Sequence, residues 1–204
     1  MLDTREKILK AADDLFARVG FDAATTREIA EKSRVNKALI HYHFKNKEGL
    51  LACLLDRYYE KLAYTLRDAL LDEGSLRARM HRLVDTYLDF LSQNRNFNRI
   101  VQREASGGKH MERISGHMSP LFEMGIHVIR EVYPSTSSGE MSAAQLLVSF
   151  YGMCITYFTY SRLIEQLSGE DPLSREGLDV RKRHLFKMID IMVDAIEKQE
   201  SKSG

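Results

Sequence analysis

Residues 34–47 read RVNKALIHYHFKNK, and two histidines, His41 and His43, flank a tyrosine in this stretch. An H-x-H spacing can supply half of a metal site, because neutral imidazole is a common ligand of zinc and related metals. Basic and aromatic residues mixed in one short stretch can equally form a surface that binds nucleic acid. The secondary structure decides between these interpretations, because it fixes which side chains share a face.

Two short helices are predicted in and before this stretch. Thr25 and Glu28 have the spacing of a capping box, which predicts a helix from about Thr26. Asn36 is a good N-cap for a following helix over residues 37–44. The brief turn between the two helices is typical of a helix-turn-helix.

Two further helices are predicted on either side of this pair. Residues 4–19 carry an apolar stripe at helical spacing, with Asp3 as the predicted cap and Gly20 at the end. Asn46 is placed to cap a long helix over residues 47–71.

Helical spacing argues against a metal site at the histidine pair. Residues i and i+2 of a helix diverge by about 200°, so His41 and His43 cannot bind one ion together. Ile40 and Phe44 share the predicted inward side, which leaves an outward, basic and aromatic face. We predict no metal and no cofactor. The alternative is a solvated surface helix without a partner.

Charge is concentrated around this helix. Residues 27–47 hold six Lys/Arg against two Asp/Glu, whereas residues 48–204 hold twenty against twenty-two. A basic segment on a near-neutral chain points to a localised contact with a polyanion. The N-terminus lacks the apolar core of a signal peptide, no apolar run is long enough to span a membrane, and the two cysteines are predicted to be core residues. We therefore expect a cytoplasmic protein without a membrane partner.

The rest of the chain is predicted to be helical as well, which makes the fold all-α. Helices are expected over residues 76–93 and 97–105, and a segment over residues 109–133 is expected to be interrupted near Gly116 and Pro120. After a loop over residues 134–140, two long helices are expected over residues 142–167 and 178–199.

The stretch FDAATTREIAEKSRVNKALIHYHFKNKEGLLACLLD, residues 21–56, closely resembles the DNA-binding segment of the TetR/AcrR family of bacterial transcriptional repressors. The resembling motif comprises Gly20-Phe21, TTREIA, a turn ending in Val35, HYHF and KNKEGLL. The family usually has Gly where this chain has Arg34, at a position that tends to be left-handed, and an Arg there carries a modest conformational cost.

The resemblance implies a domain organisation and a set of DNA contacts. A helix-turn-helix domain over residues 1–48 would be joined by the fourth helix to a helical effector-binding and dimerisation domain over residues 49–204. The residues that match phosphate or base contacts in the family, together with Arg34 as an added phosphate contact, are Thr26, Arg27, Arg34, Lys37, Ala38, Leu39, His41, Tyr42, His43 and Lys47.

The resemblance also implies a homodimer that binds a palindromic double-stranded operator at the nucleoid and releases it when an effector tilts the fourth helix. The last two helices are apolar over wide arcs, which fits a dimer interface or, alternatively, an internal core. An activator, or a regulator without a ligand, remains an alternative within the family.

The effector is predicted to be a lipophilic or aromatic small molecule, because aromatic and methionine side chains recur in the C-terminal part. Possible polar anchors in this lining are Arg103, Glu104, His110 and His117, and the spacing of His110 and His117 leaves a metal-dependent effector as an alternative. The candidate pocket residues are Phe90, Phe97, Arg103, Met111, His117, Met118, Phe122, Tyr157 and Phe158.

The sequence argues against two other classes of protein. The chain has no G-x-S-x-G, P-loop, H-E-x-x-H or C-x-x-C motif, so an enzyme is not expected. A helical scaffold would not need the basic helix at residues 37–44.

Overall fold

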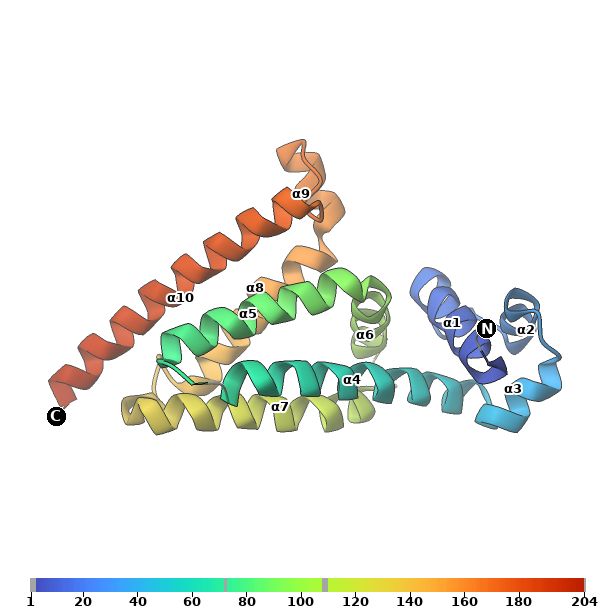
Figure 1. Cartoon of the computed structure of the whole chain (residues 1–204), viewed down its shortest axis with the longest axis horizontal. Helices are drawn as coiled ribbons and strands as arrows, with labels where there is room; N and C mark the ends of the chain where they lie inside the picture. Colours follow the sequence, from blue (N-terminus) through green and yellow to red (C-terminus); the bar gives the residue numbers. More distant parts are fainter. Residues whose placement is uncertain (1–2, 72, 108–109, 204) are drawn as a thin grey trace. The chain divides into compact units, whose positions relative to one another are not determined.

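The structure is a computed structural model that describes residues 3–71, 73–107 and 110–203 (Figure 1). Within these ranges it consists of helices and connecting loops and has no β-strand, as the sequence predicts. The chain divides into two compact units. Unit 1 comprises Met1–Lys61 and Asn94–His117, and unit 2 comprises Leu62–Gln93 and Met118–Gly204.

Unit 1 is built around its first helix. The helices of this unit are α1 (Thr4–Val19), α2 (Thr26–Ser33), α3 (Lys37–Phe44), the first part of α4 (Lys47–Leu71), α6 (Arg95–Gly107) and the start of α7 (Met111–Val132). α1 packs on α2, α3 and α6. The apolar stripe of α1 is buried through Ile8, Leu9, Leu15 and Phe16, whereas its last member, Val19, is 42% exposed.

The four predicted helix starts of this unit are confirmed. The Asp3 side chain accepts a hydrogen bond from the Glu6 amide, and Thr25 and Glu28 form the reciprocal capping box. The Oδ1 of Asn36 accepts from the Ala38 amide at 2.9 Å. The Oδ1 of Asn46 likewise accepts from the Gly49 amide, at 2.8 Å, which caps α4. Each cap satisfies an amide that the first turn of a helix leaves unpaired.

The turn between α2 and α3 is left-handed at Arg34, with φ 56° and ψ 43°. The Arg34 amide donates to the Glu31 carbonyl and the Val35 amide donates to the Ala30 carbonyl, which is the pattern of a Schellman motif. Glycine adopts this conformation at little cost, and arginine does so only with steric strain at Cβ. The turn therefore keeps its usual geometry although it lacks its usual residue.

The predicted domain boundary between residues 48 and 49 separates a DNA-binding part from an effector-binding and dimerisation part, and it stays a prediction. The compact unit that holds the helix-turn-helix extends further along α4, to Lys61, and includes α6. α4 is thus a single helix that contributes its first part to unit 1 and its second part, Leu62 to Leu71, to unit 2.

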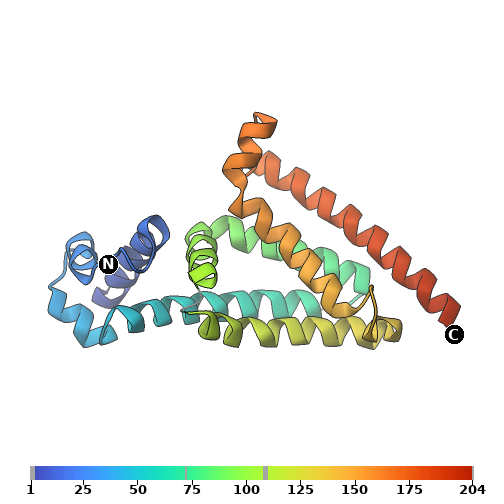
Figure 2. The same cartoon turned by 180° about the vertical axis from the view of Figure 1, so that it is seen from behind.

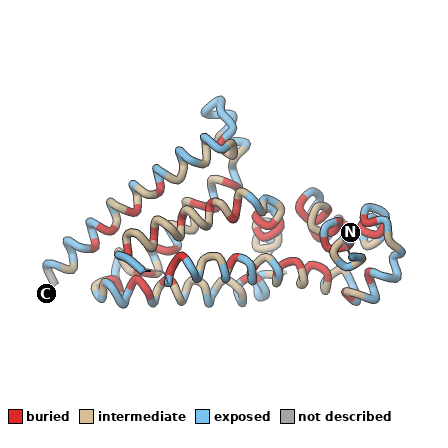
Figure 3. The backbone as a smooth tube through the Cα atoms, in the orientation of Figure 1, coloured by how far each residue is buried: buried red, intermediate tan, exposed pale blue. Residues whose placement is uncertain are grey.

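Unit 2 contains the remaining helices. They are the second parts of α4 and α7, then α5 (Leu76–Gln93), the 3₁₀ helix η1 (Pro134–Ser137), α8 (Ala143–Thr159), α9 (Ser161–Ser168) and α10 (Arg175–Ser203). α10 lies alongside α5, and α5 also packs on α8 (Figures 1 and 2). Buried positions recur about every turn along α5 and α10, which is the burial pattern of amphipathic helices (Figure 3).

Two predictions about helices in the C-terminal part are wrong, one of an interruption and one of a continuous helix. α7 runs without interruption through Gly116 and Pro120. Proline removes one backbone donor and crowds the carbonyl four residues earlier, which here belongs to the exposed Gly116, so solvent can satisfy that carbonyl. The helix predicted over residues 142–167 is divided at Tyr160 (φ −102°, ψ 22°) into α8 and α9.

None of the helices that the structure describes combines the length and the apolar character needed to cross a membrane.

Candidate DNA-binding surface and effector cavity

The short helix α3 turns one side inward and presents the other to solvent. Ile40 and Phe44 are 1% and 6% exposed, and they pack into the core of unit 1 as predicted. Tyr42 is 80% exposed, and its ring meets the ring of His43 edge-on at 5.1 Å. The exposed residues of this face are Lys37, Ala38, Leu39, His41 and Tyr42, with His43 half-buried at its flank. This face therefore presents an aromatic hydroxyl, imidazole groups and an ammonium to solvent on one short helix, all of which can donate hydrogen bonds to phosphates or base edges.

The α2 side of this surface carries three further predicted contacts. Thr26 is half-buried at the first position of α2, and Arg27 is exposed. The Nε of Arg27 lies 2.9 Å from Glu31, one turn later, and this hydrogen bond raises the pKa of the guanidinium. Arg34 is exposed at the left-handed turn. All three stay predictions as DNA contacts.

Lys47 is engaged within the protein. Its ammonium donates hydrogen bonds to the carbonyl oxygens of Phe21 (2.8 Å), Asp22 (3.2 Å) and Ala24 (2.9 Å). The ammonium also lies 4.3 Å from the centre of the Phe21 ring. An ammonium has three hydrogens to donate, so a phosphate contact by Lys47 would have to share or replace one of these bonds. The predicted phosphate clamp therefore has a second, structural role that the sequence pattern does not show.

Close packing at the start of α4 fixes its direction relative to α3. A Cβ at Gly49 would overlap the Phe44 carbonyl oxygen at the end of α3. Only glycine allows the first turn of α4 to pass so close to α3. Lys45 lies between the helices with φ 66° and is exposed. It is a further cation beside the surface that the sequence interpretation left out, although it belongs to the same basic run.

No metal site is found among the residues that the structure describes, since no three His, Cys, Asp or Glu side chains there are grouped to hold an ion. His110 and His117, whose spacing left a metal-dependent effector open, are each bound to carboxylates. His117 Nε2 lies 2.8 Å from Asp56 Oδ1, and its ring stacks on Tyr59 at 4.8 Å.

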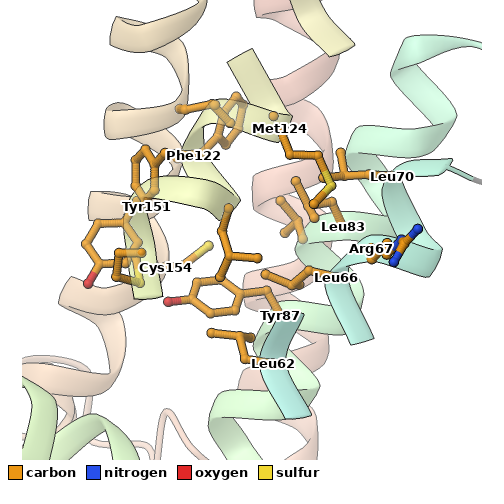
Figure 4. Close-up of a pocket in the computed structure, with 16 residues that line it drawn as sticks. Leu62, Leu66, Arg67, Leu70, Leu83, Tyr87, Phe122, Met124, Tyr151 and Cys154 are labelled. Atoms are coloured by element: carbon orange, nitrogen blue, oxygen red, sulfur yellow. The ribbon is translucent and has the colours of Figure 1, made fainter. Parts of the chain in front are cut away.

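A small apolar cavity lies inside unit 2. Its volume is about 90 Å³, and Figure 4 shows the side chains that converge on it from α4, α5, α7 and α8. Burial raises the pKa of the Cys154 thiol to about 12, so this residue is an uncharged part of the wall at neutral pH. The lining residues are Leu62, Leu66, Arg67, Leu70, Leu83, Val84, Tyr87, Met118, Leu121, Phe122, Met124, Gly125, Leu147, Phe150, Tyr151 and Cys154.

Only two of the predicted pocket residues, Met118 and Phe122, line this cavity. Of the others in unit 2, Phe90 and Phe158 are buried elsewhere, and the Tyr157 hydroxyl donates to the Pro172 and Gly177 carbonyls.

The remaining predicted pocket residues lie in unit 1. Phe97 packs on Tyr58 and Tyr59, Met111 is 44% exposed, Arg103 lies close to Gly20, and His117 contacts Asp56. Leu62, Leu66 and Leu70 of α4 also line the cavity and were not predicted, because their spacing marks one helical face but does not distinguish a cavity wall from a filled core.

Residues 8–54 match the family model described as "Bacterial regulatory proteins, tetR family". Residues 77–189 match the model described as "Tetracyclin repressor-like, C-terminal domain". The first match spans the helix-turn-helix, and the second spans most of unit 2.

Curated relatives and solved structures agree with these models. The class A tetracycline repressor of Escherichia coli is 26% identical over 201 residues, covering 93% of this chain and 79% of that protein. "Probable HTH-type transcriptional regulator YttP" of Bacillus subtilis is 35% identical over 107 residues, or 52% of each chain. The chain spans about half the length of this and two other curated relatives that it matches.

Among solved structures, AibR in complex with isovaleryl coenzyme A and operator DNA superposes with a TM-score of 0.74 at 16% identity, covering 91% of this chain and 97% of that one. PfmR of Thermus thermophilus gives a TM-score of 0.73 at 17% identity, with 93% and 96% covered. The two curated relatives are a repressor and a probable transcriptional regulator and not enzymes, in agreement with the sequence prediction. The chain belongs to the TetR family of bacterial regulatory proteins.

Proposed function

We propose that this protein is a sequence-specific DNA-binding transcriptional repressor that acts at the bacterial nucleoid as a homodimer. The observation that carries the proposal is the exposed face of α3, on which Lys37, His41 and Tyr42 are exposed to solvent. The buried side chains of Ile40 and Phe44 anchor this helix in the core of unit 1. The small Ala38 at the start of this face lets the helix approach base edges closely. Lysine, tyrosine and histidine supply donors for phosphates and bases.

The homodimer is supported by apolar side chains that unit 2 leaves in water. They lie on α8, α9 and α10 and at Tyr160 between α8 and α9, and α9 has no buried residue. A helix-turn-helix protein uses two-fold symmetry to bind two half-sites roughly 34–36 Å apart, so a second copy is the partner that this function requires. The exposed apolar residues of these helices are Val148, Tyr160, Leu163, Leu167, Val180 and Ile191, each more than half exposed.

The cavity of unit 2 supports a lipophilic or aromatic effector. At about 90 Å³ it is smaller than typical ligand pockets, which hold roughly 300–1,000 Å³. An effector must therefore displace side chains. Met118 and Met124 have flexible unbranched side chains, and the Phe122 ring can rotate, so these three residues can move to enlarge the cavity. α4 contributes Leu62, Leu66, Arg67 and Leu70 to this wall, and the same helix begins at Lys47 in unit 1. A ligand that favours a displaced α4 would shift the protein away from its DNA-binding conformation.

The test is a footprint of the purified, unliganded protein on DNA selected from a genomic library and on the DNA that flanks its own gene. A protected palindrome with two half-sites at helical spacing, lost as salt rises, supports the proposal. Binding without sequence preference at all salt concentrations, or a protein that sediments as a monomer at micromolar concentration, contradicts it.

A further inference from the structure

The cavity of unit 2 is lined by a single kind of charge. Of the sixteen residues that the structure places around it, Arg67 on α4 is cationic, and none is an aspartate or a glutamate. The Cys154 thiol is uncharged, because burial raises its pKa to about 12. The tyrosine hydroxyls of the wall are neutral at physiological pH as well. The cavity is therefore an apolar space with one positive charge in its lining.

Arg67 lies at the edge of this space. Its side chain is exposed, whereas Leu62 and Leu70, which line the cavity from the same helix, are 2% and 4% exposed. Figure 4 shows the Arg67 guanidinium pointing away from the apolar side chains of Leu66 and Tyr87. The aliphatic stem of Arg67 thus borders the cavity while the charged group lies in water at its rim, as is usual for long cationic side chains on apolar surfaces.

The guanidinium of Arg67 has no carboxylate beside it on its own helix face. Side chains three and four residues apart share a face of a helix. Arg77, by contrast, is bound by two aspartates of α10. The donors of Arg67 can therefore bind an anion from solution. The residues three and four positions from Arg67 are Ala63, Tyr64, Leu70 and Leu71.

We propose that this cavity binds a small amphipathic anion, whose apolar chain enters between α4, α5, α7 and α8 and whose carboxylate or phosphate group pairs with Arg67 at the rim. This inference rests on the proposed function and names the class of its effector. A guanidinium presents its N–H groups as a fixed fork, which matches the oxygens of a carboxylate or a phosphate. A lipophilic cation is disfavoured, because the lining has no carboxylate to offset its charge and Arg67 repels it.

Both ends of such a ligand act on α4. Its chain contacts the leucines of α4 in the cavity wall, and its head group contacts Arg67 on the same helix. A space of about 90 Å³ is too small for the chain, so the wall must shift to admit it. The bound anion therefore favours conformations with a displaced α4, and the affinity for DNA falls.

The experiment compares probes that share one chain and differ in the head group. Isothermal titration calorimetry of the full-length protein, below the micellar concentrations, measures the affinity for octanoate, 1-octanol and octylamine at about pH 7.5, where the acid and the amine are both ionised. Octanoate should bind at least roughly fivefold more tightly than octanol, because a charge-assisted pair adds to the burial of the chain. Octylamine should bind more weakly than either. Octyl phosphate in place of octanoate identifies which of the two head groups Arg67 prefers.

Variants separate the contribution of the head group from that of the chain. Arg67→Gln should bind octanoate and octanol equally, and Arg67→Lys should restore part of the preference because it restores the charge. Arg130→Gln is the matched control and should keep the preference, since Arg130 is an exposed arginine of α7 in unit 2 that does not line the cavity. Phe122→Ala enlarges the cavity and should strengthen the binding of octanoate. Thermal unfolding verifies that each variant is folded.

The inference is overturned, and the DNA-binding proposal left intact, if the wild type prefers octanoate no more than octanol or if Arg67→Gln keeps the preference. The Arg67 stem would then only cover the apolar wall. An affinity for octanoate that does not rise in Phe122→Ala would show that the chain lies outside this cavity. If Arg67→Gln does not fold, the comparison of head groups on the wild type decides the question.

Gel shift tests the link to DNA separately. Octanoate should release the wild type from its selected DNA at a concentration at least roughly fivefold lower than it needs for Arg67→Gln, because release follows occupancy of the site. Binding of octanoate without any effect on DNA affinity would overturn its role as an effector. Absence of sequence-selective DNA binding by the wild type would overturn the proposed function, while the calorimetry still decides whether the anion site exists.

Discussion

The Lys47 ammonium lies 2.8 Å from the carbonyl oxygen of Phe21 and 4.3 Å from the centre of the same residue's ring. One side chain at the start of α4 therefore holds the loop between α1 and α2 by a hydrogen bond and a cation–π contact together. Since α2 follows this loop directly, the contact fixes the place of the whole helix-turn-helix relative to α4.

Replacing Lys47 should consequently weaken DNA binding and also loosen unit 1. Lys47→Ala removes the hydrogen bonds to the carbonyls of Phe21, Asp22 and Ala24, of which the first and the last are partly buried, and we expect a loss of about 2 kcal/mol in the free energy of unfolding. Lys45→Ala is the matched control, because Lys45 is exposed two residues earlier. Chemical denaturation measures the effect, and equal stability of the two variants would show that the carbonyl contacts add nothing.

Tyr42 should matter for DNA and not for folding. Its side chain is 80% exposed, so Tyr42→Ala should change the free energy of unfolding by less than about 0.5 kcal/mol. The same change should reduce operator affinity roughly tenfold, because a donor and an aromatic contact surface are lost from the interface.

Tyr64→Ala is the control for this prediction. Tyr64 is 73% exposed on α4, in the part that belongs to unit 2. Gel shift and thermal unfolding of the two variants should give equal melting temperatures but unequal affinities. Unchanged binding by Tyr42→Ala would remove α3 from the proposed interface.

Arg34 is the residue at which stability and recognition are expected to oppose each other. Its φ of 56° costs a residue with a Cβ about 1 kcal/mol, so Arg34→Gly should stabilise the protein by an amount of that order. The same change removes a cation from the predicted phosphate contacts, so the salt dependence of binding should become shallower by about one unit of slope. A variant that is less stable than the wild type would show that the Arg34 side chain makes contacts that outweigh the strain.

Unit 1 was predictable from the sequence, because its helices begin at local signals. Thr25 with Glu28, and Asn36 two residues before Ala38, fix helix starts by hydrogen bonds within four residues of chain, and such bonds are readable without tertiary context. That the Ile40 side chain faces the core likewise follows from helical spacing alone.

The effector cavity was not predictable in the same way. Met118 and Phe122 line it while Tyr157 and Phe158, close in type, do not. Whether an apolar side chain faces a void or a neighbour depends on how α4, α5, α7 and α8 meet, and no local pattern records that. The continuity of α7 through Pro120 was missed for another reason, since propensity favours a break there, whereas the carbonyl that the proline leaves unbonded belongs to the exposed Gly116 and can bond to solvent.

The contact of α5 with α10 should make stability sensitive to acid. Asp190 on α10 receives hydrogen bonds from Arg77 (3.3 Å) and lies 2.9 Å from His81 Nε2. Burial acts to raise the pKa of Asp190, but these two partners outweigh it and hold the pKa below its usual value. A carboxyl whose pKa is lowered on folding adds stability above its unfolded pKa, and that stability is lost as pH falls below about 4.

Arg77→Ala tests this. The melting temperature of the variant should lie below that of the wild type at neutral pH, and the difference should shrink as pH falls below about 4. Arg162→Ala, at an exposed position of α9, is the control and should follow the wild type throughout. A difference that stays constant with pH would mean that Arg77 acts through packing and not through the ionised carboxylate.

The cavity itself is tested by enlarging it. Phe122 lines the cavity, is half-buried, and meets the Tyr151 ring at 5.6 Å. Phe122→Ala should destabilise the protein by about 2 kcal/mol, less than a fully buried phenylalanine would, and should leave a larger apolar space. Binding of the apolar dye 1-anilinonaphthalene-8-sulfonate to the folded variant should therefore strengthen.

Phe186→Ala is the matched control for this last change. Phe186 is also half-buried in unit 2, where it stacks on His81 at 4.7 Å, and it does not line the cavity. Its removal should lower the melting temperature without strengthening dye binding, because no space is added to the cavity. If both variants bind the dye equally, the dye reports general loosening of unit 2, and the cavity is not the site at which an apolar ligand enters.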